Sequence, residues 1–354
     1  MTKTISAHPA RNAETEIVAI ASAGGGDMPN DRRELDPDIL AAWERIKDKA
    51  SPVTTTASKQ AKLQRMCLPY PRQLEAMTAY ESARLLGLET RGEPQMGLNI
   101  FDATGTGKST SADQYRRLIE RDAPEGTIPV LHVSLGTTGT GRQLYAAIMG
   151  ALGDGFATAG NEGTLRARAM KMMQAKGVQL LILDEAHHAG RSGFRGDITA
   201  EVKLMLDMGV VPIVLLGTEE ARPILASAKE LAGRLMSPCK LSPLDWADED
   251  DRELWNGLVK SLDARMVREG VTSKLIGLDD PVLAENLAQV TNGTIGQLMR
   301  VMIEATKIAT YDHRDHIVVE DLAEAVDNWS IEHGFASSNP LWTLMPYDDA
   351  EAAE

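Results

Sequence analysis

Short apolar runs alternate with stretches of helical period in the middle of the chain. The runs are "LNIF" at 98–101, "VLHVSL" at 130–135, "LLILD" at 180–184 and "VPIVLLGT" at 211–218. Strands buried on both faces of a parallel sheet read as nearly continuous apolar runs, so this alternation predicts an α/β fold, a parallel sheet flanked by helices. After Trp246 the runs stop and the pattern is helical, which predicts an α-helical domain behind the sheet.

Two helices are expected ahead of the sheet. Asp36 followed by Pro37 is typical of a helix N-cap and first helical position. In the later stretch "YPRQLEAMTAYESARLLGL", the apolar residues Leu74, Met77 and Leu85 recur at helical spacing. The chain therefore enters the sheet through a helical segment.

These patterns divide the chain into five parts. The parts are a disordered N-terminal arm at 1–33, an N-terminal helical segment at 34–95, an α/β domain at 96–244, a helical lid domain at 245–332 and a C-terminal tail at 333–354. The arm is assigned from its Gly-, Ala- and Pro-rich composition, which offers little apolar surface to bury.

Composition indicates a cytoplasmic protein that makes no use of a membrane. Hydrophobic residues make up 43% of the chain, and no run approaches the roughly 18 apolar residues of a membrane span. The N-terminus has no apolar run of the signal-peptide kind. The two cysteines, Cys67 and Cys239, have no partners at metal-ligand spacing, which favours a reducing compartment.

The stretch "DATGTGKS" at 102–109 has the features of a phosphate-binding loop, because it follows a strand and leads into a helix. Gly105 and Gly107 let backbone N–H groups turn toward the phosphates, Lys108 supplies a positive charge to the β- and γ-phosphates, and the Ser109 hydroxyl is offered to Mg²⁺. The residues expected to hold the nucleotide are Thr104, Gly105, Thr106, Gly107, Lys108, Ser109 and Thr110.

Asp102 stands where the usual pattern has its first glycine. A side chain at this position costs conformational freedom but leaves the phosphate cradle in place. Taken alone, the loop leaves a chance glycine turn as the alternative interpretation.

The strand "LLILD" supplies the second half of the site. Asp184 at its end is expected to hold Mg²⁺ together with Ser109, and Glu185 is expected to orient and polarise the attacking water as a catalytic base. The cofactors are therefore ATP and Mg²⁺. "DEAH" also occurs in helicases with two motor domains, but the helical remainder of this chain leaves no room for a second one. His187 and His188 are expected to shape this loop, because the sequence shows no third metal ligand.

Two further residues are candidates for the catalytic set, beside Glu185 and Lys108. Thr218 ends the last apolar run, where a parallel sheet faces its ligand crevice, so it is either a sensor of the γ-phosphate or the N-cap of the next helix. Arg234 precedes another short apolar run, and it is either a finger that reaches the γ-phosphate of a neighbouring subunit or a surface arginine.

These motifs, in this order, resemble an AAA+ ATPase, a P-loop sheet followed by a helical lid. More narrowly, "LLILDEAHH", "VPIVLLGTEEA", "ELAGRL" and "LSPLDW" look like TniB, a TnsC-like ATP-dependent regulator of transposition. The resemblance covers about 70–328. It implies ATP-driven assembly of a ring or helical filament on duplex DNA, recruitment of a DDE-type transposase and choice of a target site. One departure is in the lid, where Gly296 takes the place of a sensor arginine and Arg300 follows one helical turn later.

DNA contacts would have to come from a local basic region, because the formal net charge is −14. Basic residues outnumber acidic ones between Gly136 and Gln179, and the loop "AGRSGFRGD" adds two arginines. In the family, loops at these places face the centre of the assembly. The candidate DNA contacts are Arg142, Arg166, Arg168, Arg191 and Arg195. The alternative is an ordinary solvated face. No base-reading motif is present, so little sequence preference is expected.

Three functions fit these observations. The first is a transposition ATPase that assembles on DNA. The second is an AAA+ switch that acts on a protein partner in secretion or defence, without DNA. The third is a scaffold that binds nucleotide without hydrolysing it, and Glu185 argues against it. ATP-dependent retention on plain duplex DNA separates the first two.

Overall fold

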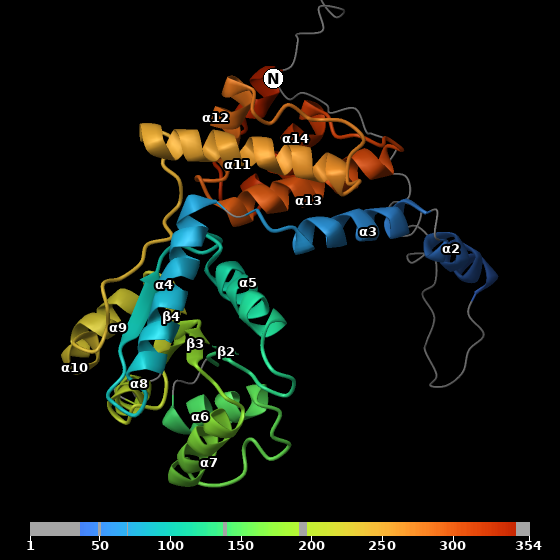
Figure 1. Ribbon diagram of the computed structural model, residues 1–354. Coiled ribbons are helices and arrows are strands. Elements are labelled where there is room, and N and C mark those ends of the chain that lie inside the picture. Colours follow the sequence, from blue (N-terminus) through green and yellow to red (C-terminus); the bar gives the residue numbers. More distant parts are fainter. Residues whose placement is uncertain (1–35, 49–50, 69, 137–139, 191–196, 345–354) are drawn as a thin grey trace, which may run out of the picture. The chain divides into compact units, whose positions relative to one another are not determined.

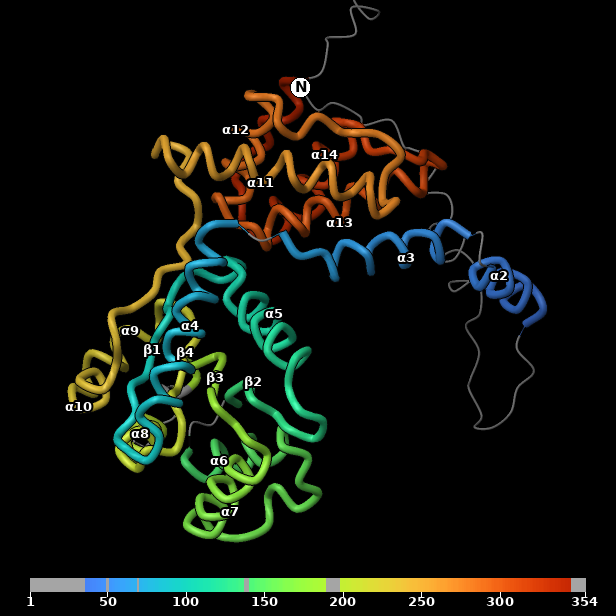
Figure 2. Tube along the Cα trace, in the orientation of Figure 1, coloured from blue at the N-terminus to red at the C-terminus, as the bar shows by residue number. Residues whose placement is uncertain are grey.

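The computed structural model describes residues 36–48, 51–68, 70–136, 140–190 and 197–344. Figures 1 and 2 show the chain in one orientation. The predicted arm at 1–33, Arg191 and Arg195, and the end of the predicted tail lie outside the described residues.

The described strands form one parallel sheet. They are β1 (Gly97–Phe101), β2 (Val130–Ser134), β3 (Leu180–Asp184) and β4 (Ile213–Gly217), in the order β1-β4-β3-β2. All residues of β1, β3 and β4 are buried, which explains why their sequences are apolar except at Asn99 and Asp184. A single parallel bridge from Gly97 to Leu235 continues the sheet beyond β1. The predicted α/β fold with a parallel sheet is confirmed.

The helices carry the following bounds. They are α2 (Pro37–Lys47), α3 (Pro52–Arg65), α4 (Pro71–Glu89), α5 (Lys108–Arg121), α6 (Gly141–Ala151), α7 (Glu162–Ala175), η1 (Ala186–Gly190), α8 (Asp197–Asp207), α9 (Ala221–Ser227), α10 (Lys229–Ala232), α11 (Glu249–Arg268), α12 (Pro281–Val290), α13 (Ile295–Tyr311), α14 (Val319–Ala325), η2 (Val326–Ile331) and η3 (Pro340–Leu344).

The chain divides into two compact units. The sheet unit comprises Cys67–Leu254 and Gly293–Gly296, and the helical unit comprises the remaining residues, with the segment up to Met66 among them. The predicted segment 34–95 is thus shared, because α3 belongs to the helical unit and α4 to the sheet unit. In the helical unit, Gln60 of α3 donates a hydrogen bond of 3.2 Å to the carbonyl of Ile303 in α13.

Helices cover both faces of the sheet. On one face α4 and α5 contact the strands, as Figure 1 shows, and on the other α6 packs against β2. The second face carries an apolar core, which includes Leu183 of β3, Leu144 of α6 and Val202 of α8. Side chains alternate between the two faces along each strand, so β1, β3 and β4 are covered on both faces, whereas Ser134 at the end of β2 is exposed.

Helix α4 buries a different side from the one that carries its larger apolar residues. Leu74 and Leu85 are 51% and 47% exposed. The buried residues are Gln73, Ala76, Tyr80 and Ala83. The predicted helix is therefore present, but its buried side differs from the one expected. Helix α2 begins after the N-cap Asp36 as predicted.

None of the described helices is long and apolar enough to cross a membrane.

Candidate nucleotide site

The loop between β1 and α5 has the backbone shape of a phosphate cradle. Gly105 and Gly107 have φ of 83° and 95°, values that favour glycine. Gly107 is the N-cap of α5, so the loop ends at the N-terminus of a helix, where free N–H groups and the helix dipole attract anions. Thr104, Ser109 and Thr110 are exposed and Thr106 is buried.

Lys108 is held inside this loop. Its Nζ donates to the backbone carbonyls of Asp102 and Ala103 at 2.8 and 2.6 Å. Burial lowers the pKa of Lys108, and the carboxylates of Asp102 and Asp184 act against that shift. The ammonium group therefore lies beside the loop that surrounds the phosphate position and beside the acidic end of β3.

Asp184 lies at the carboxyl end of β3, next to the P-loop serine. Burial alone would raise the pKa of Asp184. Hydrogen bonds from His132, from the Ser109 hydroxyl and from the Glu185 N–H outweigh burial and hold that pKa below its usual value. The His132 Nε2 is 3.2 Å from the carboxylate. Asp184 is therefore ionised at neutral pH. Asp184 and Ser109 meet as oxygen ligands of Mg²⁺ require, so the residues present fit this ion.

Glu185 adopts an unusual backbone conformation, with φ of 61°. Its N–H donates to the Asp184 carboxylate at 2.8 Å, which stabilises the tight turn at the strand end. Its carboxylate is 3.3 Å from His187 Nε2 and 3.9 Å from His188 Nε2. These three residues offer ligand atoms within 4.8 Å of one another. The expectation that the two histidines have no third ligand nearby is therefore wrong. The Glu185 carboxylate comes close to both imidazoles because of the turn at the end of β3, which the sequence does not show.

Thr218 directly follows β4, the strand between β1 and β3. Its Oγ1 is buried and has no hydrogen-bond partner among the described residues. The N-cap of α9 is Glu220, which makes no side-chain capping bond, and the Thr218 backbone carbonyl accepts from the Ala221 N–H. The Thr218 hydroxyl therefore does not cap α9 and is available to a ligand at the edge of the sheet.

Arg234 lies at the opposite end of β1 from the P-loop, because Gly97 at the start of β1 donates to its carbonyl at 2.9 Å. Its guanidinium is 42% exposed and pairs with Asp207 of α8 at 2.6 Å. From this place Arg234 cannot reach the phosphate site of its own subunit. The two interpretations that stay open are a finger toward a neighbouring subunit and a surface arginine paired with Asp207.

Asp102 is buried, and its carboxylate accepts hydrogen bonds from three groups. These are the Leu241 N–H at 2.6 Å, the Ser242 hydroxyl at 3.3 Å and the Arg222 guanidinium at 3.4 Å. Among the described non-glycine residues, those with positive φ are Glu185, Asn292 and His313. Asp102 therefore needs no glycine-like backbone. Sequence reasoning did not find the contacts of Leu241, Ser242 and Arg222 with Asp102. Leu241 and Ser242 begin the stretch "LSPLDW", but no local pattern shows that this stretch reaches the P-loop.

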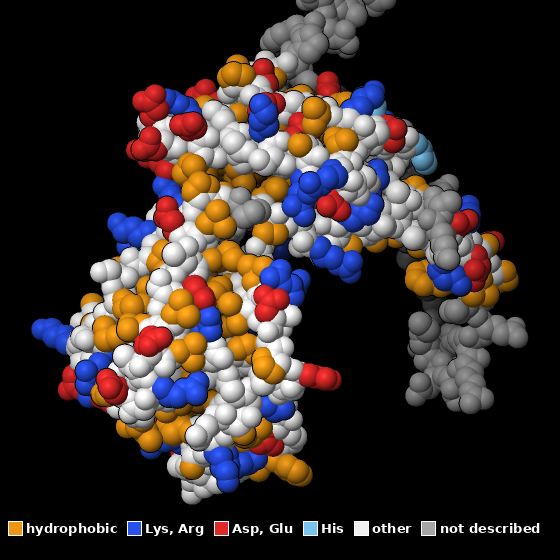
Figure 3. Space-filling model, viewed as in Figure 1, with side chains coloured by type: hydrophobic (Ala, Val, Ile, Leu, Met, Phe, Trp, Pro, Cys, Tyr) orange, Lys and Arg blue, Asp and Glu red, His pale blue; other side chains and the backbone are white. Residues whose placement is uncertain are grey.

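Two of the described candidate DNA contacts are neutralised within the fold. Arg166 forms an ion pair with the buried Glu201, and Arg168 forms one with Asp154. Arg142 is exposed and donates to the carbonyl of Thr158 at 3.0 Å. On the face shown in Figure 3, basic side chains of the sheet unit are interspersed with acidic ones.

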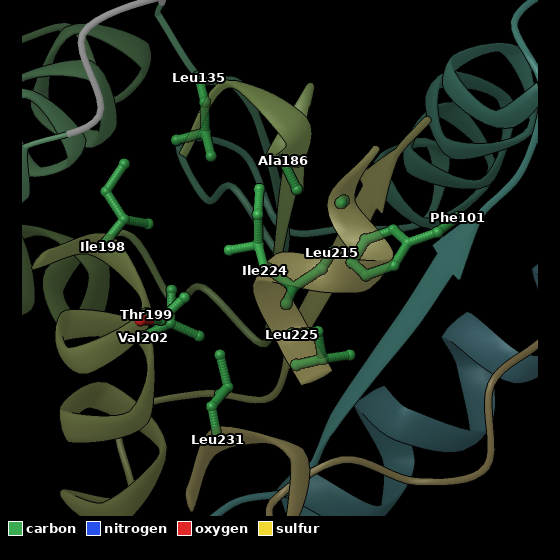
Figure 4. A pocket seen from close by; sticks show the side chains of 11 residues that line it. Phe101, Leu135, Ala186, Ile198, Thr199, Val202, Leu215, Ile224, Leu225 and Leu231 are labelled. Atoms are coloured by element: carbon green, nitrogen blue, oxygen red, sulfur yellow. The ribbon is translucent and has the colours of Figure 1, made fainter. Parts of the chain in front are cut away.

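A separate apolar pocket lies behind the ends of β1 and β4. Figure 4 shows Phe101, Leu215, Ile224 and Val202 pointing into it. No ionisable side chain lines it, so it offers nothing to a phosphate.

Solved structures show the same fold at low sequence identity. The Aeropyrum pernix ORC1 protein in complex with DNA matches with a TM-score of 0.56 and 17% identity over 76% of this chain and 69% of that chain. Cdc6p from Pyrobaculum aerophilum matches with a TM-score of 0.55 and 14% identity over 76% of this chain and 70% of that one. The Aeropyrum pernix ORC2 protein, solved as ADPNP–ADP complexes, matches with a TM-score of 0.53 and 11% identity over 71% and 67%. These neighbours are AAA+ ATPases, which confirms the P-loop NTPase fold.

The sequence comparisons are more specific. A search of the curated proteins finds no match. The family model described as "Bacterial TniB protein" matches residues 64–243, which contain the whole sheet, the P-loop, Asp184, Glu185 and Thr218. This match spans half of the chain and confirms the family suggested by its motifs. The chain belongs to the TniB family and has an AAA+ ATPase fold.

Proposed function

We propose that this protein is an ATP-dependent regulator of transposition that acts in the cytoplasm. It assembles on duplex DNA without strong sequence preference and brings a DDE-type transposase to the target. The observation that carries the proposal is the meeting of Lys108, Ser109, Asp184 and Glu185 at one edge of the sheet, in a chain of the TniB family.

Each residue of the site has a distinct part in this proposal. Lys108 and the loop N–H groups bind the phosphates, and Ser109 and Asp184 hold Mg²⁺, which neutralises charge on the β- and γ-phosphates. Glu185 orients the attacking water, and the unpartnered Thr218 hydroxyl contacts the γ-phosphate or that water. Arg234 completes the site of a neighbouring subunit.

DNA binding is supported by the family and by a structural neighbour, the Aeropyrum pernix ORC1 protein, which was solved in complex with DNA. A filament needs only weak phosphate contacts from each subunit, because many subunits act together. Within the described residues, exposed Arg142 is better placed for such contacts than the ion-paired Arg166 and Arg168.

A pair of variants tests the ATPase. Lys108→Ala removes the phosphate-binding charge and should abolish tight ATP binding. Glu185→Gln keeps the size and hydrogen bonding of the side chain but loses the carboxylate, so it should bind ATP and hydrolyse it very slowly. ATP turnover near the wild-type rate in Glu185→Gln would remove Glu185 from the mechanism.

A retention assay tests the DNA part. Wild-type protein with a non-hydrolysable ATP analogue at low salt should be retained on a long duplex of random sequence, and Lys108→Ala should not. If the wild type binds the analogue but is not retained on the duplex, the proposal that the protein assembles on DNA is refuted. An AAA+ switch that acts on a protein partner then becomes the better account.

A further inference from the structure

The two positions at which this site departs from the usual AAA+ pattern are connected by one chain of contacts. Asp102 replaces the first glycine of the P-loop, and Gly296 replaces the arginine of the lid. Both residues belong to the sheet unit. The contacts run from Asp102 through the segment Leu241–Leu244 to Gly293–Gly296, and from there back to the P-loop.

The first link is the buried carboxylate of Asp102, which is 3% exposed. A buried carboxylate is stable only where hydrogen bonds and an opposite charge compensate it. Leu241 N–H and the Ser242 hydroxyl supply the hydrogen bonds, and Arg222 supplies the charge. Arg222 also donates to the carbonyl of Phe101 at 2.8 Å, which fixes the end of β1. A glycine at 102 would provide none of these contacts.

The second link joins the segment after Ser242 to the beginning of α13. Arg72 of α4 donates to the carbonyls of Ser242 and Pro243 at 3.0 and 3.1 Å. The Leu244 N–H donates to the carbonyl of Gly293 at 3.0 Å. A Cβ atom on Gly293 would lie 1.8 Å from the Leu244 carbonyl oxygen, so the two backbones can meet only with glycine at 293.

The third link returns to the phosphate loop. The Gly296 N–H donates to the carbonyl of Gly105 at 2.8 Å. A Cβ atom on Gly296 would lie 2.7 Å from that oxygen and 2.8 Å from the Gly105 Cα. The obstructing atoms are backbone, which cannot rotate away as a side chain would. A sensor arginine at 296 is therefore excluded while the loop keeps this shape.

We propose that Asp102 is a positioning residue for ATP binding and that Gly296 acts with it, in place of a charged lid side chain. These contacts fix the P-loop at two points. The Asp102 carbonyl accepts from the Lys108 ammonium, and the Gly105 carbonyl accepts from the Gly296 N–H. The buried charge of Asp102 is the cost of this arrangement, because it repels phosphates unless Arg222 and Lys108 compensate it. The proposal rests on the proposed function only in assuming that the loop binds ATP.

The test measures the affinity of the full chain for fluorescent mant-ATP with Mg²⁺, alongside thermal unfolding. Asp102→Gly restores the usual P-loop glycine, yet it should weaken mant-ATP binding by about tenfold or more, since it removes hydrogen bonds to a charged group. Asp102→Asn keeps one acceptor oxygen, so its affinity for mant-ATP should lie between those of the wild type and Asp102→Gly. Gly296→Ala should weaken binding to a similar degree. The double variant Asp102→Gly/Gly296→Ala should lose less than the product of the single effects, because both changes break the same chain of contacts.

Two matched controls separate positioning from general stability. Asp263 is also a buried carboxylate that accepts backbone N–H groups, those of Ile276, Gly277 and Leu278, but it lies in the helical unit. Asp263→Asn should lower the unfolding temperature without changing affinity for mant-ATP. Gly257→Ala places a Cβ in open space in α11 and should leave affinity unchanged.

Three outcomes decide the proposal. Weaker binding in the Asp102 and Gly296 variants, with unchanged binding in the controls, supports it. Wild-type affinity in Asp102→Gly, or an equal loss of affinity in Asp263→Asn, overturns it. If Asp102→Gly does not fold, Asp102→Asn carries the comparison. A wild type that binds no mant-ATP refutes the proposed ATPase itself, which is a different result.

Discussion

Glu185 has a strained backbone, and Thr218 has a buried hydroxyl without a hydrogen-bond partner among the described residues. Both residues directly follow strands of the sheet. A non-glycine residue at positive φ, such as Glu185 at 61°, costs about 1–3 kcal/mol and persists only where its surroundings fix it. A buried hydroxyl without a partner, such as that of Thr218, forgoes a contribution of about 1 kcal/mol. Both are costs to folding at residues to which the proposed mechanism gives a role.

Thr218→Val tests the sensor role at the scale of one atom. The valine keeps the shape and removes the hydroxyl. Because that hydroxyl has no partner among the described residues, stability to urea should stay the same or rise slightly. Loss of a hydrogen bond to a charged phosphate costs about 1.5–3 kcal/mol, so ATP hydrolysis should fall by about 10- to 100-fold.

The matched control is Thr306→Val in α13, whose hydroxyl donates to the carbonyl of Met302 at 2.7 Å. It should leave ATP turnover unchanged. Turnover in Thr218→Val equal to that of Thr306→Val would exclude a sensor role for Thr218.

At the scale of elements, the strands were predictable and the contacts of α4 were not. A strand covered on both faces is apolar at nearly every position, so a short apolar run in the sequence indicates it. The helix α4 packs through Ala76 and Ala83, small residues that let it lie close to the sheet, and its larger leucines are exposed. Periodicity of apolar residues cannot show a close approach between backbones. Helix α3 escaped prediction because its sequence "PVTTTASKQAKLQR" contains few large apolar residues.

Substitutions on the two sides of α4 should change the free energy of unfolding by different amounts. Ala76 is fully buried and Leu74 is 51% exposed. Ala76→Leu forces extra volume into a packed interface and should reduce the free energy of unfolding by about 1–3 kcal/mol. Leu74→Ala should change it by no more than about 0.5 kcal/mol. Urea denaturation of both variants measures this, and a larger loss in Leu74→Ala would contradict the packing of α4.

Arg234, which lies just beyond the start of β1, is proposed to complete the nucleotide site of a neighbouring subunit. ATPase activity should then rise steeply with protein concentration, because an isolated subunit has an incomplete site. Arg234→Ala should bind ATP but lack that rise. A mixture of Arg234→Ala with Lys108→Ala should partly restore turnover, because the first has an intact P-loop and the second an intact arginine. Co-assembly of the two proteins without any recovery would argue against action between subunits.

Lys229→Ala is the control for Arg234. The substitution removes a positive charge from neighbouring α10, and Lys229 has no role in the proposed mechanism. Its activity should rise with concentration as the wild type does.

At the scale of the whole molecule, the site was predictable where motifs carry it and not where distant segments meet. The P-loop and the end of β3 are recognisable because each is a continuous stretch with its chemistry inside it. The contact of Asp102 with Leu241 joins residues 139 positions apart, and no local pattern signals it. Likewise, the number of arginines between Gly136 and Gln179 says nothing about which of them are already paired with acids.

Charge pairing leads to a prediction for DNA binding by the acidic chain. Binding should need ATP, ignore sequence and weaken steeply with salt. Reversing Arg142 and Arg195 to Glu should lower affinity alike on all duplexes and leave ATPase activity without DNA intact. Arg166→Glu should instead destabilise the fold, because it places a second carboxylate beside buried Glu201. Anisotropy titrations with a non-hydrolysable analogue measure the affinities. Sequence-dependent losses would contradict phosphate contact.

The meeting of Gly296 with Gly105 also restricts how this sequence can evolve. A Cβ of residue 296 would lie 2.7 Å from the Gly105 carbonyl oxygen, so every change at Gly296 that adds a side chain meets the same obstacle. A mutational path to a lid arginine at this position must first displace the phosphate loop and with it the proposed nucleotide site. Exposed Arg300, one helical turn later, is free of that barrier. New lid chemistry in this lineage should therefore arise around residue 300 and leave residue 296 as glycine.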